Sequence, residues 1–255
     1  MATENWQSFR VKNRRDQKLA AMLRKSNTPD STLIIVCHGF TGSKEGQGQA
    51  VEIGEQLYNR GYSTLLFDFA GSGESEGVNK ERTLSNQVED LEAIVTWAKQ
   101  EDFNRIILSG RSFGGSTVLS YSALDKDITA VCTWAAVARL ERLFLPLIGG
   151  KLEGPADEVI KLESEEGCLE LKRRFFLDLR NHDMLKYAAE VAPRSFLLVH
   201  GTNDESVPPK DAELIYDAAA EPKKLVWIEG ADHRFSGYKE QVWKTFFSWL
   251  DNLPA

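Results

Sequence analysis

Short runs of apolar residues alternate with longer amphipathic stretches along most of the chain. The run Leu33–Cys37 is apolar without strict alternation, which is typical of a strand covered on both faces of a sheet. The stretch 83–99 differs, because its apolar residues fall on one helical stripe: Leu84, Val88, Leu91, Ile94, Val95 and Ala98. This contrast predicts strands at 33–37, 63–67, 105–109, 128–134, 195–200 and 223–228, and helices at 49–59, 83–99, 113–123, 210–219 and 238–250.

The order of these elements predicts the fold class. Strands that alternate with helices form βαβ units, which give an α/β fold with a doubly wound, mostly parallel sheet. The opening segments 6–11 and 18–23 instead fit an antiparallel hairpin on the sheet edge. With 255 residues, of which 42% are hydrophobic, the chain is long enough for one large α/β domain with a sizeable core.

One interval interrupts this alternation. The 60 residues from 135 to 194 separate two predicted strands, whereas a plain crossover needs only about a dozen. The interval contains apolar LFLPLIGG, then charged KLEGPADEVIKLESEEG, then LELKRRFFLDL. We interpret it as an inserted cap over the sheet edge, because long insertions in such domains are often lids; an extra pair of surface helices is the alternative. The predicted domains are a core at 1–134 and 195–255 and a cap at 135–194.

Composition narrows the range of partners and compartments. The net charge of −7 argues against binding to nucleic acid or to an anionic membrane. Cys37, Cys132 and Cys168 are widely spaced and show neither a disulfide framework nor zinc-site spacing, which suits a reducing compartment. The sequence shows no apolar core of a signal peptide and no apolar stretch of about 18 residues. We therefore expect a cytoplasmic protein without a membrane span.

The strongest chemical motif is Gly110-Arg111-Ser112-Phe113-Gly114, which follows an apolar strand and opens a predicted helix. A sharp strand-to-helix turn exposes the serine hydroxyl in strained backbone angles, and small flanking residues leave room for it. The amides at the start of the helix would face negative charge that develops during attack. A glycine-rich turn in a crossover is the alternative, but the strand and helix around the motif favour Ser112 as a nucleophile.

A second motif, HGFTG at 38–42, comes directly after an apolar strand. At a nucleophile turn of this kind, one oxyanion donor is the amide after the serine, here that of Phe113, and the other comes from the loop after an earlier strand. Phe40 is the expected second donor, because the preceding glycine lets the backbone turn toward the site. The alternative is a simple turn with a capping histidine. His38 is expected to be structural, since it precedes the nucleophile.

Candidates for the acid and the base follow two later strands. Asp204, in HGTNDESVP, is placed to hydrogen-bond the far nitrogen of a catalytic histidine and fix its tautomer. Glu205 is its neighbouring competitor, and a turn-forming aspartate is the alternative interpretation. His233 is the only one of the four histidines in a loop after the last predicted strand, which favours it as general base. Asp232 beside it is expected to be a turn or surface residue.

Together these motifs resemble the α/β-hydrolase superfamily, and within it the small lidded hydrolases grouped with feruloyl (cinnamoyl) esterases, monoglyceride lipases and serine aminopeptidase-like proteins. The resemblance runs through VCHGFTGSKE, GRSFGG, VHGTNDESVP and GADHRF, and the order Ser112, Asp204, His233 is that of the superfamily. The stretch DFAGSGES also resembles the family's D-x-x-G-x-G-x-S, in which Asp68 is expected to anchor a loop. Position 111 is arginine where the family often has histidine, and the cap matches no family pattern.

The resemblance implies a serine hydrolase that cleaves a carboxylic ester by acyl transfer. His233 would take the proton from Ser112 while the amides of Phe40 and Phe113 hold the oxyanion. Phe235, which closely follows the base, is expected to contact the substrate. Neither a metal nor an organic cofactor is implied. The expected partner is a small-molecule ester, and the oligomeric state is left open, a homodimer included.

Other functions remain open as alternatives. Basic residues in or near the cap would suit a thioesterase that binds acyl-CoA, although such a cluster is more often a solvated face: Arg139, Arg142, Lys172, Arg173 and Arg174. A peptidase would need a site for a peptide terminus, which the sequence does not indicate. A non-catalytic binding homologue usually lacks part of the triad, which is complete here. Four apolar cap residues fit either an acyl pocket or the packing of a cap helix: Phe144, Leu145, Leu147 and Ile148.

Overall fold

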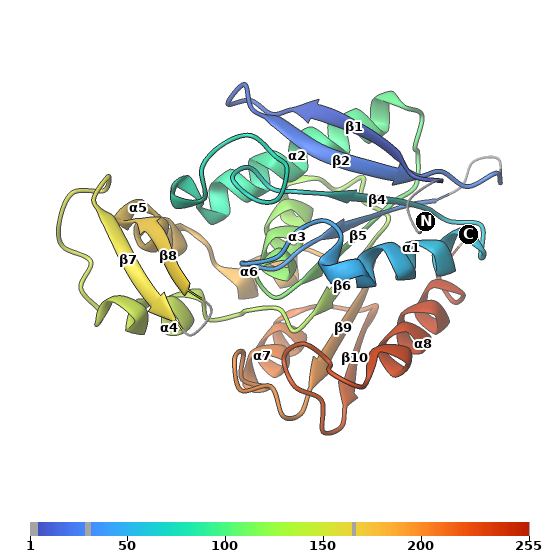
Figure 1. Cartoon of the computed structure of the whole chain (residues 1–255). Coiled ribbons are helices and arrows are strands. Elements are labelled where there is room, and N and C mark those ends of the chain that lie inside the picture. Colours follow the sequence, from blue (N-terminus) through green and yellow to red (C-terminus); the bar gives the residue numbers. More distant parts are fainter. Residues whose placement is uncertain (1–4, 29–31, 165–166, 255) are drawn as a thin grey trace.

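The computed structural model describes residues 5–28, 32–164 and 167–254, and an eight-stranded sheet forms its centre (Figure 1). The sheet order is β1-β2-β4-β3-β5-β6-β9-β10, in which the strands from β4 to β10 run parallel and β1 and β2 form an antiparallel edge hairpin. The mostly parallel sheet and the edge hairpin confirm both predictions. The strands are β1 (Gln7–Lys12), β2 (Lys18–Arg24), β3 (Leu33–Cys37), β4 (Ser63–Phe67), β5 (Ile106–Arg111), β6 (Ala130–Trp134), β9 (Ser195–Gly201) and β10 (Lys223–Ile228).

Helices cover both faces of the sheet, as expected for apolar parallel strands. One hydrophobic cluster joins one face of the sheet to α1 (Gln49–Tyr58) and α8 (Lys239–Leu250). A larger cluster joins the other face to α2 (Leu84–Gln100), α3 (Phe113–Leu124), α6 (Met184–Ala189) and α7 (Lys210–Ala218). Full burial of one leucine or phenylalanine side chain contributes about 1.5–3 kcal/mol, so these clusters dominate the stability of the fold.

The interval between β6 and β9 forms a separate group of elements, at the left of Figure 1. It contains α4 (Leu140–Phe144), the antiparallel hairpin of β7 (Val159–Ser164) and β8 (Gly167–Lys172), and α5 (Arg173–Asp178). The last helix of the interval, α6, packs instead in the same cluster as α3, through Ala188. The predicted interval 135–194 therefore includes one helix of the core layer. We propose that the cap proper ends before α6.

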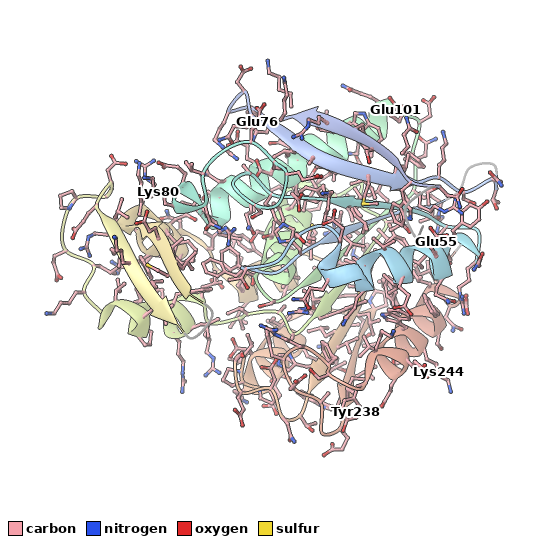
Figure 2. The ribbon with its side chains drawn as sticks, in the orientation of Figure 1. Glu55, Glu76, Lys80, Glu101, Tyr238 and Lys244 are labelled. Carbon is pink, nitrogen blue, oxygen red and sulfur yellow. The ribbon has the colours of Figure 1, made fainter. Side chains whose placement is uncertain are left out.

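Four short 3-10 segments complete the regular structure of the described residues: η1 (Gly46–Gly48), η2 (Asn79–Glu81), η3 (Leu145–Ile148) and η4 (Leu179–Asn181). Charged side chains such as Glu76, Lys80, Glu101 and Lys244 lie at the periphery of the molecule (Figure 2). Within the described ranges, the helices are too short or too polar to cross a membrane.

Asp68 anchors the loop after β4, as its motif suggested. Its side chain is fully buried, accepts hydrogen bonds from the backbone amides of Lys44 and Glu74 at 2.7 and 2.9 Å, and lies 3.1 Å from the Lys44 ammonium. We expect Asp68→Ala to lower the free energy of unfolding by about 2 kcal/mol, because it leaves buried donors without their acceptor. Urea denaturation would measure this change. Asp127→Ala, at a side chain that is 83% exposed, is the control and should change stability by less than about 0.5 kcal/mol; equal effects would contradict the anchoring role.

Candidate active site

Ser112 lies at the sharp turn between β5 and α3, with φ +54° and ψ −124°. A non-glycine residue at positive φ is strained, and such strain is common at catalytic positions. The glycines beside it allow the close crossing of strand and helix. A β-carbon at Gly110 would lie 2.3 Å from the carbonyl oxygen of Gly114, and one at Gly114 would lie 2.3 Å from that of His38. The structure therefore has the sharp strand-to-helix turn that the motif predicted.

Gly114→Ala is expected to disturb this turn through steric overlap with backbone atoms. The new methyl group would meet the carbonyl oxygens of Cys37 and His38 at 2.5 and 2.3 Å and push α3 away from β3. We expect a loss of about 2 kcal/mol of stability and at least a tenfold loss of kcat/KM in a hydrolysis assay. Thermal unfolding and ester hydrolysis would measure both effects. Gly48→Ala is the control for backbone strain without steric overlap, since its φ is +90° but nothing lies within 4 Å of its β-carbon position; it should lose some stability and retain activity. Full activity of Gly114→Ala would show that the tight crossing is unnecessary.

Three side chains from distant parts of the sequence meet at the carboxyl edge of the sheet. Ser112 Oγ lies 3.0 Å from His233 Nε2, and His233 Nδ1 lies 2.8 Å from Asp204 Oδ2. The other carboxylate oxygen of Asp204 accepts hydrogen bonds from the amides of Ser206 at 3.0 Å and Val207 at 2.7 Å. The imidazole therefore bridges the hydroxyl and the carboxylate, which is the geometry that general-base activation of a serine requires.

The environment of Asp204 keeps its carboxyl group ionised. Burial would raise its pKa, but hydrogen bonds from His200, His233 and the amide of Val207 outweigh burial and hold the pKa well below its usual range. A carboxylate that accepts several hydrogen bonds is stabilised in its charged form. It can thus accept a hydrogen bond from Nδ1–H of His233 and stabilise the imidazolium that would form when the serine is deprotonated.

The residues that could compete with Asp204 and His233 for these positions make other contacts. Glu205 is exposed, and Asp232 is an exposed turn residue whose Oδ1 accepts from two amides of its own loop. His38 is buried, and its Nε2 accepts a hydrogen bond from the amide of Phe69 at 3.2 Å. Burial lowers the pKa of His38 to about 4, which keeps its ring neutral. These placements agree with structural roles for Asp232 and His38.

The loop that carries Phe40 lies beside Ser112. A β-carbon at Gly39 would be 3.4 Å from the β-carbon of Ser112, and the rings of Phe40 and Phe113 have centroids 5.4 Å apart. Phe113 begins α3, so its amide belongs to the positive end of that helix. The two amides predicted as oxyanion donors therefore come from segments that meet at Ser112.

Arg82 is a residue of this region that the sequence did not single out. It is 3% exposed, its Nη1 donates to the carbonyl oxygen of Phe40, and its Nη2 donates to Ser72 Oγ at 2.7 Å. Its guanidinium also lies 4.8 Å from the centroid of the Phe40 ring. Burial lowers the pKa of Arg82 to about 10. Arg82 thus fixes the conformation of the Phe40 loop, and only its spatial contacts reveal this.

Phe235 does not share the aromatic environment of Phe40. It is 5% exposed, has φ +56°, and packs in the cluster beneath α8 with Val242 and Phe246. Its side chain therefore belongs to the core. This placement favours packing over the substrate contact that its position near His233 had suggested.

Four phenylalanine rings pack together where the loop of Phe40 and the start of α3 meet the cap. Phe40 lies 5.1 Å from Phe144 of α4 and 5.3 Å from Phe175 of α5, and Phe113 packs against the same two rings. Phe144 is therefore buried, whereas Leu147 of the same apolar run is 53% exposed. This phenylalanine cluster (residues 40, 113, 144 and 175) joins the cap to the loops that carry the candidate oxyanion amides.

Arg111, which departs from the family's usual histidine, precedes Ser112 and interacts electrostatically with Asp204, Asp232 and Arg234. Burial lowers its pKa, and the charge of Arg234 lowers it further, whereas Asp204 and Asp232 raise it. Arg111 therefore adds positive charge near the carboxylate of the triad.

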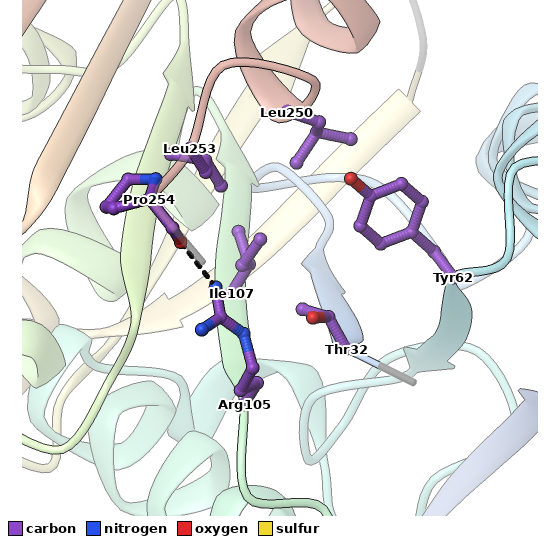
Figure 3. Close-up of a pocket in the computed structure, with 7 residues that line it drawn as sticks. All are labelled: Thr32, Tyr62, Arg105, Ile107, Leu250, Leu253 and Pro254. Carbon is purple, nitrogen blue, oxygen red and sulfur yellow. Dashed lines mark hydrogen bonds between the residues drawn. The ribbon is translucent and has the colours of Figure 1, made fainter. Parts of the chain in front are cut away.

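A cavity at the opposite edge of the sheet is separate from this site. It lies at the amino end of β5, whereas Ser112 follows the carboxyl end of the same strand (Figure 3). Arg105 lines it and donates to the carbonyl oxygen of Pro254 at 2.9 Å. Its other lining residues are Thr32, Tyr62, Ile107, Leu250 and Leu253. Among the described residues, no group of three or more His, Cys, Asp or Glu side chains is arranged to hold a metal ion.

The sheet, the sharp turn at Ser112 and the insertion after β6 define an α/β hydrolase. The sequence profile of the serine aminopeptidase S33 family (Hydrolase_4) matches residues 28–160, and the chain belongs to this family. The match includes Ser112 and ends before Asp204 and His233, so the grouping of these three residues rests on the geometry described above.

Several relatives and solved structures are similar to the chain. It is 30% identical to the uncharacterized protein YfhR of Salmonella typhi, over 80% of this chain and 65% of YfhR. It is 33% identical to the quorum-quenching protein AidA of Acinetobacter baumannii, over 46% of this chain and 39% of AidA. The chain thus spans less than two thirds of the length of these relatives.

The structural similarity is more extensive. A structure of Est1E from Butyrivibrio proteoclasticus with bound ferulic acid superposes with a TM-score of 0.85 at 26% identity, over 96% of this chain and 98% of that chain. Mouse alpha/beta hydrolase domain-containing protein 10 superposes with a TM-score of 0.81 at 21% identity, over 97% of this chain and 100% of that chain, which shows the shared fold alone. These matches confirm the predicted resemblance to the lidded esterase-like hydrolases.

Proposed function

We propose that this α/β hydrolase is a serine esterase that cleaves a carboxylic ester through an acyl-enzyme. The observation that carries the proposal is the contact chain in which His233 lies 3.0 Å from Ser112 Oγ and 2.8 Å from Asp204 Oδ2. The structural similarity to Est1E, which has been solved with ferulic acid bound, supports ester chemistry.

The mechanism follows from these positions. His233 Nε2 takes the proton of Ser112 as the serine oxygen attacks the ester carbonyl, and the amides of Phe40 and Phe113 stabilise the oxyanion. When the tetrahedral intermediate collapses, His233 returns the proton to the departing alkoxide, which leaves as the alcohol. A water molecule, deprotonated by His233, then attacks the acyl-enzyme, and release of the acid restores Ser112.

The cap argues for an oxygen ester over acyl-CoA. Four of the five basic residues that would suit a CoA phosphate contact acidic side chains: Arg139 with Asp211, Lys172 with Glu81 and Asp157, Arg173 with Glu158, and Arg174 with Asp157. Paired charges attract an anionic ligand much less than unpaired ones. Phe40, which is the least buried ring of the phenylalanine cluster and packs against Phe113 beside Ser112, offers an apolar and aromatic contact instead. We therefore propose an ester with an apolar or aromatic acyl group.

A panel of three substrate classes tests this proposal. The wild-type enzyme would be assayed on p-nitrophenyl butyrate, butyryl-CoA and leucine p-nitroanilide, with Ser112→Ala as the blank. We expect kcat/KM on the ester to exceed that on the other two by at least about tenfold. A higher value on butyryl-CoA would make the protein a thioesterase, and a higher value on the anilide would make it an aminopeptidase.

We also propose a cytoplasmic location and a small-molecule partner. Cys37 and Cys132 are buried free thiols, which suits a reducing compartment. The net charge of −7 supports neither nucleic acid nor an anionic membrane as a partner.

A further inference from the structure

His200 is a buried histidine that the proposed acyl transfer does not use. It is the penultimate residue of β9 and is 1% exposed. Strand register pairs it with Trp227 of β10, and the two rings pack edge to face with centroids 6.1 Å apart. Strand pairing and aromatic packing therefore fix the position of the His200 ring, four residues before Asp204.

The contacts of His200 determine which of its nitrogens carries a hydrogen. Its Nε2 lies 2.9 Å from the carbonyl oxygen of Val207 and 3.2 Å from Asp204 Oδ2. A carbonyl and a carboxylate oxygen can only accept hydrogen bonds, so a lone pair on Nε2 would face two other lone pairs. Nε2 must therefore carry a hydrogen, which it shares between these two oxygens.

His200 contacts the same carboxylate oxygen of Asp204 that accepts a hydrogen bond from His233. Asp204 Oδ2 lies 2.8 Å from His233 Nδ1 and 3.2 Å from His200 Nε2, so two imidazoles approach a single oxygen atom. Oδ1 is occupied by two backbone amides, one of them that of Val207. Because the carbonyl oxygen of Val207 also accepts a hydrogen bond from His200 Nε2, Val207 links the Asp204 carboxylate and its loop to the end of β9.

We propose that His200 is a positioning residue of the triad, which orients the Asp204 carboxylate and shares its charge with His233. The inference rests on the proposed function, because it assumes that Asp204 and His233 act on Ser112. His200 does not touch the reacting atoms and acts only through Asp204.

This arrangement has a consequence for the pH–rate profile. The hydrogen bond from His200 draws negative charge toward itself and so weakens the stabilisation that Asp204 gives to protonated His233. When this donor is removed, protonated His233 becomes more stable, and the acid limb of the kcat/KM profile moves to higher pH. The other charged groups near the carboxylate, Arg111, Asp232 and Arg234, stay unchanged in both variants described next.

The test compares His200→Phe with His200→Gln. Phenylalanine keeps a ring but removes the donor, whereas glutamine keeps a side-chain N–H at a similar distance from the backbone. For His200→Phe we expect kcat to fall about tenfold and the acid limb to rise by about half a pH unit. For His200→Gln we expect the acid limb of the kcat/KM profile to lie close to its wild-type position. A limb that stays in place in His200→Phe, or that moves equally in both variants, would overturn the proposal.

A measurement on the wild-type protein covers the case in which His200→Phe does not fold. Long-range ¹H–¹⁵N spectra of protein labelled at its four histidines report the tautomer of each ring. We expect a hydrogen on Nε2 of His200, and its signals are identified by their absence in His200→Gln. A hydrogen on Nδ1 with none on Nε2 would overturn the proposal. Neither result bears on the esterase assignment, which fails separately if Ser112→Ala remains active.

Discussion

Replacement of Ser112 by alanine is expected to lower kcat for p-nitrophenyl butyrate by about ten-thousandfold or more. The variant lacks the oxygen that forms the acyl-enzyme, so only the oxyanion amides and substrate binding could still accelerate hydrolysis. The fold should survive, because alanine removes one partly exposed hydroxyl. Steady-state hydrolysis measures the effect, and far-UV circular dichroism verifies folding.

Ser120→Ala is the matched control for this substitution. Ser120 lies on the same helix, α3, and its hydroxyl donates only to the carbonyl oxygen of Ser116 at 2.9 Å. It should retain activity within about threefold of wild type. If Ser112→Ala hydrolysed the ester as fast as Ser120→Ala, the proposed nucleophile would be wrong.

Asp204→Asn is expected to have the second largest effect, lowering kcat by about a thousandfold or more. The carboxamide has no negative charge to stabilise protonated His233. It can also present an N–H group to Nδ1, which forces the proton onto Nε2, where it faces Ser112 and blocks general-base action. The variant keeps nearly the same shape, so its loss of activity would reflect hydrogen bonding and charge.

The neighbouring carboxylate supplies the control for Asp204→Asn. Glu205 is exposed and was the competitor for this role in the sequence. Glu205→Gln should leave kcat unchanged within about twofold, because its side chain is solvated. The opposite pattern, with Glu205→Gln inactive and Asp204→Asn active, would reassign the acid.

Much of the core fold was predictable because burial leaves a clear pattern in sequence. The strands 33–37 and 63–67 have the predicted boundaries, since both are continuous apolar runs. β5 extends past its predicted end at Ser109 to Arg111, which pairs with Trp134 of β6. That extension depends on the neighbouring strand. The cap was predictable only as an interval, because its hairpin and short helices gain stability from contacts that the local sequence does not encode.

For the residues of the site, too, the sequence predicted what local motifs encode and did not predict what depends on contacts between distant segments. Motifs on strand ends predicted that Ser112, Asp204 and His233 would meet, because parallel strands bring their carboxyl ends to one edge. Nearness to His233 in sequence did not indicate that Phe235, which has a positive φ, packs in the core beneath α8. The role of His200 arises from distances across the fold; a histidine at the end of an apolar strand was the only local signal.

Reaction with a fluorophosphonate probe tests the central claim most directly, because the probe bonds covalently only to an activated serine. Mass spectrometry of the labelled protein should locate one adduct on the peptide that contains Ser112, with none in Ser112→Ala and much slower formation in His233→Ala. Failure of the folded wild-type protein to react, or an adduct on another serine, would contradict the assignment.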